Sequence, residues 1–172
     1  MMTRNFVLSA AATASAALLA TQVWAAEPTI KEVTVNTDYS SLKESNAQSY
    51  YPELSQDLLE AILERISLTD EVEGYVIDVN IQSVSLDGDT MLPDSAEFNQ
   101  MEGVMSLQSP MTNANTESYP IKIKAHSAEA AVPEGYVGVA PSTDDFYNAM
   151  IAGFADVVAE ELPERMRESG SK

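Results

Sequence analysis

The clearest pattern along the chain is the alternation of apolar and polar residues from Gly74 to Leu86, GYVIDVNIQSVSL. Apolar side chains first take the odd-numbered positions and polar ones lie between them: Tyr75, Ile77, Val79 and Ile81 against Asp78, Asn80 and Gln82. This period of two predicts a strand with one face toward water. The alternation slips at Ser83, because Val84 and Leu86 are even-numbered. A β-bulge between Gln82 and Val84 is therefore expected.

The same alternation predicts three further strands. They cover Ile30–Thr37, Phe98–Gln108 and Tyr119–Ser127. In the last of these, Lys122 and Lys124 face outward, and they would lie across from Asp78 and Asn80 if the two strands share a face. The connection Ala128–Pro141 can include a short strand at Tyr136–Val139.

Two segments have helical spacing instead. Pro52–Ile66 repeats its apolar residues every three or four positions and begins with a proline, which suits the first turn of a helix. Thr143–Leu162 carries an apolar stripe that includes Phe146, Met150 and Phe154. Pro163 is expected to end or kink this second helix, leaving residues 167–172 as a flexible tail.

The predicted order is strand, helix, three strands, helix. Two amphipathic helices can cover one face of a four-stranded sheet while the other face stays wet. The sequence therefore predicts an α+β fold, a two-layer sandwich with a four-stranded mixed sheet and two helices on one face.

The first 25 residues are typical of a secretory signal peptide. Arg4 precedes an apolar run, Phe6–Val23, and small residues surround an expected cleavage point after Ala25. An uncleaved membrane anchor is the rival interpretation, but the run is short and is interrupted by Ser and Thr. The expectation is a periplasmic or secreted protein with one domain over residues 26–166 and no stable membrane insertion after cleavage. The chain has no cysteine, so it offers no thiol for a lipid anchor.

The charge balance narrows the classes of partner. Aspartate and glutamate number 27 against nine lysines and arginines, a net charge of −18. Binding to nucleic acid or to anionic lipid head groups needs clustered cations, so neither is expected. High solubility is the simplest explanation of the acidity, and capture of cations or of a basic partner is the alternative.

Candidate chemistry is sparse. His126 is the one histidine, and its neighbour Ser127 would point to the opposite face of a strand, so the two cannot form a nucleophile and base pair. Asp87 and Asp89, with Asp94 nearby, could form a weak calcium site, but the full twelve-residue calcium-loop pattern is missing and a plain turn is the favoured interpretation. Copper binding by methionine is disfavoured because most candidates fall on apolar faces. No cofactor, metal site or catalytic residue is expected, and the chain is not expected to be an enzyme.

One geometric argument points to a binding surface. If the first two strands are parallel and the next three form an antiparallel meander, strands one, two and four finish at the same end. The three longest connections then leave from that end, and long loops in compact domains are often functional. We expect binding residues on this loop rim, which carries tyrosines amid carboxylates: Tyr39, Tyr50, Tyr51, Asp87, Asp89, Asp94 and Tyr136.

The β-α-β-β-β-α order resembles that of bacterial periplasmic envelope accessory proteins. The segments that carry the resemblance are EVTV, YPELSQDLLEAILERI, GYVIDVNIQSVSL and TDDFYNAMIAGFADVVAEEL. The families it is similar to are the TolB amino-terminal-like domain and the small lipoproteins that accompany envelope transporters. The resemblance rests on element order and implies an accessory role with an envelope protein as partner. It transfers no functional residue.

The function expected from the sequence is therefore an exported, non-catalytic envelope accessory or protein-binding domain. It would act through the loop rim or through an open sheet edge. A small-ligand or divalent-cation binding protein is the alternative, and a hydrolase is the third option.

Overall fold

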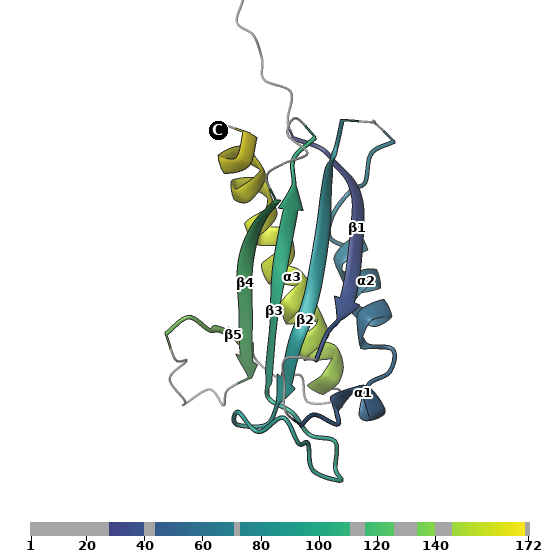
Figure 1. Ribbon diagram of the computed structural model, residues 1–172, viewed down its shortest axis with the longest axis vertical. Coiled ribbons are helices and arrows are strands. Elements are labelled where there is room, and N and C mark those ends of the chain that lie inside the picture. Colours follow the sequence, from purple (N-terminus) through teal and green to yellow (C-terminus); the bar gives the residue numbers. More distant parts are fainter. Residues whose placement is uncertain are drawn as a thin grey trace, which may run out of the picture.

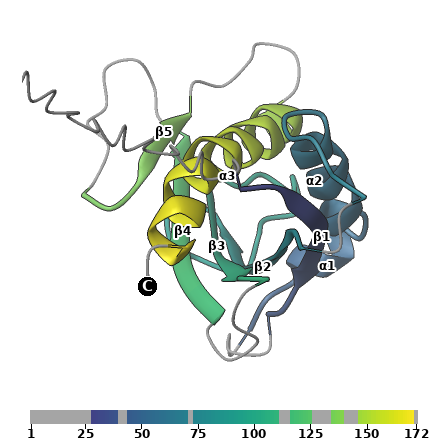
Figure 2. The same ribbon diagram turned by 90° about the horizontal axis from the view of Figure 1, so that it is seen from above.

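The computed structural model describes residues 28–39, 44–70, 73–110, 116–125, 134–139 and 146–170. A five-stranded sheet has the order β1-β2-β3-β4-β5, and helices α2 and α3 lie together on one face of it (Figures 1 and 2). The predicted export segment, Met111 and His126 lie outside the described residues.

The strands are β1 (Ile30–Thr37), β2 (Tyr75–Ser85), β3 (Gln100–Gln108), β4 (Thr116–Ala125) and β5 (Val137–Val139). β1 and β2 are parallel, β2, β3 and β4 form an antiparallel meander, and β5 pairs in parallel with the end of β4. This arrangement confirms the predicted α+β two-layer sandwich. The short β5 lies within Tyr136–Val139, the segment where the sequence allowed a short strand.

The bulge predicted in β2 is present. Ile81 pairs with Gly103 but Ser83 pairs with Glu102, so one extra residue of β2 is accommodated between them. After the bulge the even-numbered Val84 is fully buried, as Ile81 is before it. The bulge therefore returns the apolar side chains of β2 to the helix-covered face.

The helices are α1 (Ala47–Tyr50), α2 (Leu54–Leu63) and α3 (Phe146–Gly170). The short α1 lies inside the connection between β1 and α2, and Ala47 is fully buried there. α2 agrees with its sequence pattern, because Leu54, Leu58 and Ile62 form its buried stripe.

α3 does not end at Pro163 but continues to Gly170, so residues 167–170 of the predicted tail are helical. Leu162 and Met166 are buried on either side of the proline. The Tyr75 hydroxyl of β2 donates a 2.9 Å hydrogen bond to the Met166 carbonyl. Tertiary packing thus retains turns that a proline disfavours locally.

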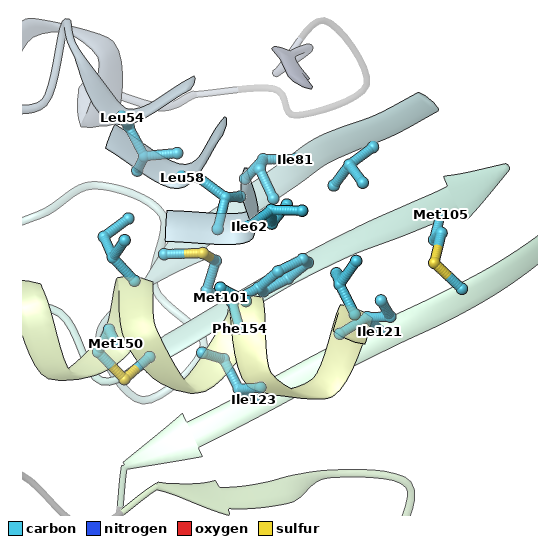
Figure 3. Packing of buried hydrophobic residues seen from close by; sticks show 14 of the residues in the cluster. Leu54, Leu58, Ile62, Ile81, Met101, Met105, Ile121, Ile123, Met150 and Phe154 are labelled. Carbon is cyan, nitrogen blue, oxygen red and sulfur yellow. The ribbon is translucent and has the colours of Figure 1, made fainter. Parts of the chain in front are cut away.

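The core lies between the sheet and the two long helices. Phe154 of α3 is fully buried and lies close to Met101 and Ile123 (Figure 3). Gly103 allows this approach, since a Cβ atom at that position would lie 3.1 Å from Phe154 Cζ and 2.7 Å from the Asn80 carbonyl oxygen. Met101, Met105 and Met150 are fully buried, which confirms them as core residues. Each fully buried side chain of this size stabilises the fold by about 1.5–3 kcal/mol.

No helix of the described residues covers the opposite face of the sheet (Figure 1), and polar side chains such as Asp78 and Lys122 lie on it. Lys122 does not lie against Asp78 or Asn80, because β3 separates β4 from β2. It forms a 3.0 Å ion pair with Glu102 of β3 instead. Asp78 accepts a 3.3 Å hydrogen bond from Asn36 of β1.

Candidate interaction surface at the loop rim

The strand directions bring the long connections to one end of the molecule, as the sequence predicted. β1, β2 and β4 all run toward the same end (Figure 1), because β1 is parallel to β2 and β3 is antiparallel to both of its neighbours. The structure describes three parts of this loop rim: residues 38–39 with 44–53, residues 86–99, and residues 134–136. Of the three connections that form the rim, the loop 86–99 is the one that the structure describes in full.

The loop 86–99 begins with a tight turn. The Leu86 and Asp89 backbones exchange two hydrogen bonds of 2.9 Å. The turn residues Asp87 and Gly88 have φ angles of 50° and 92°, a left-handed geometry that aspartate and glycine tolerate better than most residues. The Asp-Gly pair therefore terminates β2 sharply and exposes the Asp87 and Asp89 carboxylates.

Asn46 holds the middle of the loop. Its side-chain amide donates to the Leu92 carbonyl at 2.8 Å, and its side-chain oxygen accepts from the Leu92 N–H at 2.7 Å. Thr90 adds a bond from its hydroxyl to the Glu44 carbonyl at 2.5 Å. Leu92 itself is buried in the core. The segment before α1 thus fixes the loop to the body of the protein.

Tyr51 and Asn99 hold its second half. The Tyr51 hydroxyl donates to the Ala96 carbonyl, and its ring packs edge-on against Phe98 at 5.1 Å between centroids. The Asn99 side chain accepts from the Asp87 N–H at 2.9 Å and donates to the Asp87 carboxylate at 2.8 Å. The two ends of the loop are therefore joined to each other.

Four exposed carboxylates and one exposed apolar side chain remain on this loop. Met91 is 47% exposed, and the exposed acids are Asp87, Asp89, Asp94 and Glu97. The hydrogen bond from Asn99, together with the nearby Lys124 ammonium group at 3.5 Å, lowers the pKa of Asp87 from its ordinary value. Asp87 is therefore charged throughout the neutral range, and the loop carries four exposed acids together with an exposed methionine.

The predicted tyrosines do not form an exposed cluster. Tyr39, Tyr50 and Tyr51 are all partly buried and pack against the core. Tyr51 also stacks on Tyr147 of α3, with centroids 5.0 Å apart and rings 5° from parallel. Of the three, Tyr51 contacts the loop 86–99 directly, through Ala96 and Phe98.

Tyr136 lies apart from the other tyrosines. Its hydroxyl donates a 2.6 Å hydrogen bond to Glu102 of β3, and the Lys122 ammonium group lies 5.5 Å from its ring centroid. Burial raises the pKa of Glu102, but the hydrogen bonds from Tyr136 and Lys122 outweigh it and lower the pKa overall. Tyr136 thus belongs to the polar face of the sheet, where it fixes the start of β5.

Several residues that shape this surface have no local signal in the sequence. Asn46 and Asn99 are ordinary polar residues in the sequence, and only the fold brings each to its partner. Tyr147 occupies a helical segment, and its contact with Tyr51 depends on where α3 begins relative to α1. Its hydroxyl donates to Asp57 of α2 at 2.6 Å, and burial together with this bond raises its pKa.

Among the described residues, no group of three or more histidine, aspartate or glutamate side chains is placed to hold a metal ion. The carboxylates of the proposed calcium ligands point to other partners, since Asp87 bonds with Asn99 and Asp89 accepts from the Met91 N–H at 2.9 Å. In the same part of the chain, no helix combines the length and the apolar character needed to cross a membrane.

Comparisons with known proteins add one structural similarity. No protein-family profile and no curated protein sequence matches the chain. The chain is similar to a crystal structure of the rare lipoprotein B from Shewanella oneidensis. The similarity covers 82% of this chain and 94% of the lipoprotein chain, at 11% identity and a TM-score of 0.25. A TM-score this low carries no argument about function. The resemblance to the TolB amino-terminal-like domain remains a prediction.

Proposed function

We propose that this chain is an exported, non-catalytic accessory protein of the bacterial envelope that binds a basic protein partner through the loop 86–99. The observation that carries the proposal is the loop itself, which is anchored at its start, middle and end while it exposes four carboxylates around Met91. A surface that is ordered before binding loses little conformational entropy when the partner arrives.

The charge of the whole molecule supports the same class of partner. At −18 the protein attracts basic surfaces over long distances and repels acidic ones. Export is supported by the Arg4 and Phe6–Val23 pattern of the first residues. Tyr51 contributes by holding the loop in shape through its bond to the Ala96 carbonyl.

Site-specific crosslinking in intact cells tests the proposal. A photoreactive amino acid in place of Met91 should give one reproducible crosslinked protein of basic character. The same amino acid in place of Glu164, an exposed residue of α3, should not. Met91 lies in the centre of the loop, whereas Glu164 lies in the C-terminal part of α3. The two positions therefore compare two surfaces of one protein.

Charge reversal supplies the second arm. Asp89→Lys combined with Asp94→Lys should reduce the Met91 crosslink several-fold, whereas Glu160→Lys, which changes charge on α3, should leave it unchanged. Equal crosslinking from all positions would contradict the proposal. A rise in melting temperature with millimolar calcium that Asp89→Asn abolishes would favour the cation-binding alternative.

A further inference from the structure

β1 is a terminal strand of the sheet, and most of its outer edge is open among the described residues. The sheet order places β2 on one side of it only. At the start of the strand, Leu68 pairs with Ile30 in parallel, and the Thr69 N–H donates to the Ile30 carbonyl at 2.8 Å. No described segment continues this pairing beside residues 32–37.

The direction of the backbone groups follows from the ladder with β2. The Asp38 N–H donates to the Ile81 carbonyl at 2.8 Å, so residue 38 faces β2. In a parallel ladder successive residues face opposite sides, and the N–H and C=O of one residue face the same side. The N–H and C=O groups of Val33, Val35 and Thr37 therefore point away from the sheet. They form a template for one more strand.

An apolar strip lies beside this edge. α2 packs against β1 and lies behind it, at the β1 edge of the sheet (Figure 1). Asp57 of α2 and Arg65, just after the helix, face α3, where they bond to Tyr147 and Asp156. The side of α2 turned away from α3 carries Leu59 and Leu63, and Ile66 follows the end of the helix.

Two of the apolar residues near the edge are unusually accessible. Leu63 is 38% exposed and Leu68 is 49% exposed, and these are two of the four large apolar side chains most accessible in the described chain. Val35, Leu59 and Ile66 are partly buried against the core. An added strand beside Val33–Thr37 would cover such side chains with every second residue that it contributes.

The described residues on β1 and on the elements next to it include more exposed acids than cations. Glu32 lies on β1 itself, Glu60 on α2 and Glu73 before β2, and the whole chain has a net charge of −18. Lys31 is the exposed cation nearby, while Arg65 is paired with Asp156 at 2.5 Å. We infer that this edge binds an extended, basic segment of a partner protein as an additional strand, with apolar side chains toward α2 and Lys or Arg on the alternate positions.

A second copy of the same chain fits less well. Two edges of this protein would bring two molecules of charge −18 together and would place Glu32 of each close to the acids of the other. The inference goes beyond the proposed function and does not rest on it, because β1 and the loop 86–99 are separate surfaces.

Fluorescence anisotropy with a synthetic peptide tests the inference. The probe is a labelled peptide of about nine residues that alternates Val or Thr with Lys. It should bind the full chain at low ionic strength, and amide exchange should show new protection at Val33, Val35 and Thr37. A peptide of the same sequence, N-methylated at alternate residues on the pairing side, keeps every charge but cannot donate those hydrogen bonds. It should bind at least about tenfold more weakly.

Variants of the protein locate the site. Val35→Pro removes an outward N–H without removing a bond to β2, so it should weaken binding about tenfold. Glu32→Lys should weaken it several-fold, and the matched Glu160→Lys on α3 should not. Equal affinity for the N-methylated peptide would overturn the inference even if Val35→Pro fails to fold. Protection confined to residues 86–99, or dimerisation of the protein through β1, would overturn it as well.

Discussion

Two tyrosines of the loop rim and one of α3 differ in what their hydroxyl groups contact. Tyr51 donates to the Ala96 carbonyl and Tyr147 donates to the Asp57 carboxylate. The Tyr39 hydroxyl is buried and has no hydrogen-bond partner among the described residues. A buried polar group without a partner destabilises a fold, whereas a satisfied one is close to neutral or favourable. The same side chain type is therefore expected to have opposite effects at these positions.

Replacing Tyr39 with phenylalanine is expected to stabilise the protein. Tyr39→Phe removes the unpaired hydroxyl and retains the ring, which should raise the free energy of unfolding by about 1 kcal/mol. Tyr51→Phe is the matched control and should lower it by about the same amount, because it breaks the bond to Ala96. Urea denaturation at neutral pH measures both. A loss of stability in Tyr39→Phe would contradict the expectation.

The unchanged protein and Tyr39→Phe are also expected to differ in their stability in alkaline solution. Burial raises the pKa of Tyr39 from 10.0 to about 12. Between these values the unfolded chain has lost the Tyr39 proton while the folded chain retains it, so the unfolded state binds fewer protons and stability falls as pH rises. Tyr39→Phe should reduce this fall between about pH 10 and pH 12. Parallel pH profiles for the two proteins would show that Tyr39 does not contribute.

At the scale of single elements, α3 shows how contacts with another element override a local signal. Pro163 lacks the N–H that a helix interior requires, yet the helix continues to Gly170. Arg165 pairs with Glu161 before the proline and with Glu168 after it. Surface ion pairs contribute little by themselves, so the buried Met166 and the bond from Tyr75 carry more of the effect.

Tyr75→Phe tests this explanation. Loss of the hydroxyl that bonds the Met166 carbonyl should lower the free energy of unfolding by about 1 kcal/mol and speed amide exchange in the last two turns of α3. Pro163→Ala restores the missing N–H and should slow exchange in the same turns. Unchanged exchange at residues 164–170 in Tyr75→Phe would show that the hydrogen bond does not retain them.

For the whole molecule, the excess of negative charge is the dominant property. At −18, repulsion between carboxylates opposes the compact state, and the described cations are few and largely paired: Arg65, Lys122, Lys124 and Arg165 each contact an acid. Salt screens repulsion between exposed charges more than 10 Å apart at about 0.1 M ionic strength. Stability should therefore depend on salt through long-range repulsion more than through individual ion pairs.

Thermal unfolding as a function of sodium chloride measures this balance. The melting temperature should rise by several degrees between about 0.02 M and 0.3 M salt, because self-repulsion weakens more than the few ion pairs do. Glu160→Lys, which removes repulsion at an exposed site of α3, should reduce the size of the rise. A melting temperature that falls with salt would show that ion pairs outweigh repulsion.

The sequence by itself determined the features that depend on neighbours along the chain. Strand alternation and helix spacing are local, so the four long strands, α2, the stripe of α3 and the bulge beside Ser83 were all predictable. The shared end of β1, β2 and β4 was predictable too, because the crossover through α2 favours parallel β1 and β2 and a meander alternates the directions of the strands that follow.

Only the tertiary structure decided which distant residues meet. Asn46 reaches Leu92, Tyr51 stacks on Tyr147, and Lys122 pairs with Glu102 because β3 separates β4 from β2. None of these contacts leaves a trace in local periodicity, since each joins segments far apart in the sequence. The same holds for α3, where burial of Met166 and the bond from Tyr75 outweigh the local effect of Pro163. Long-range packing adds free energy that local propensity does not contain, and it therefore settled the helix end and the shape of the loop rim.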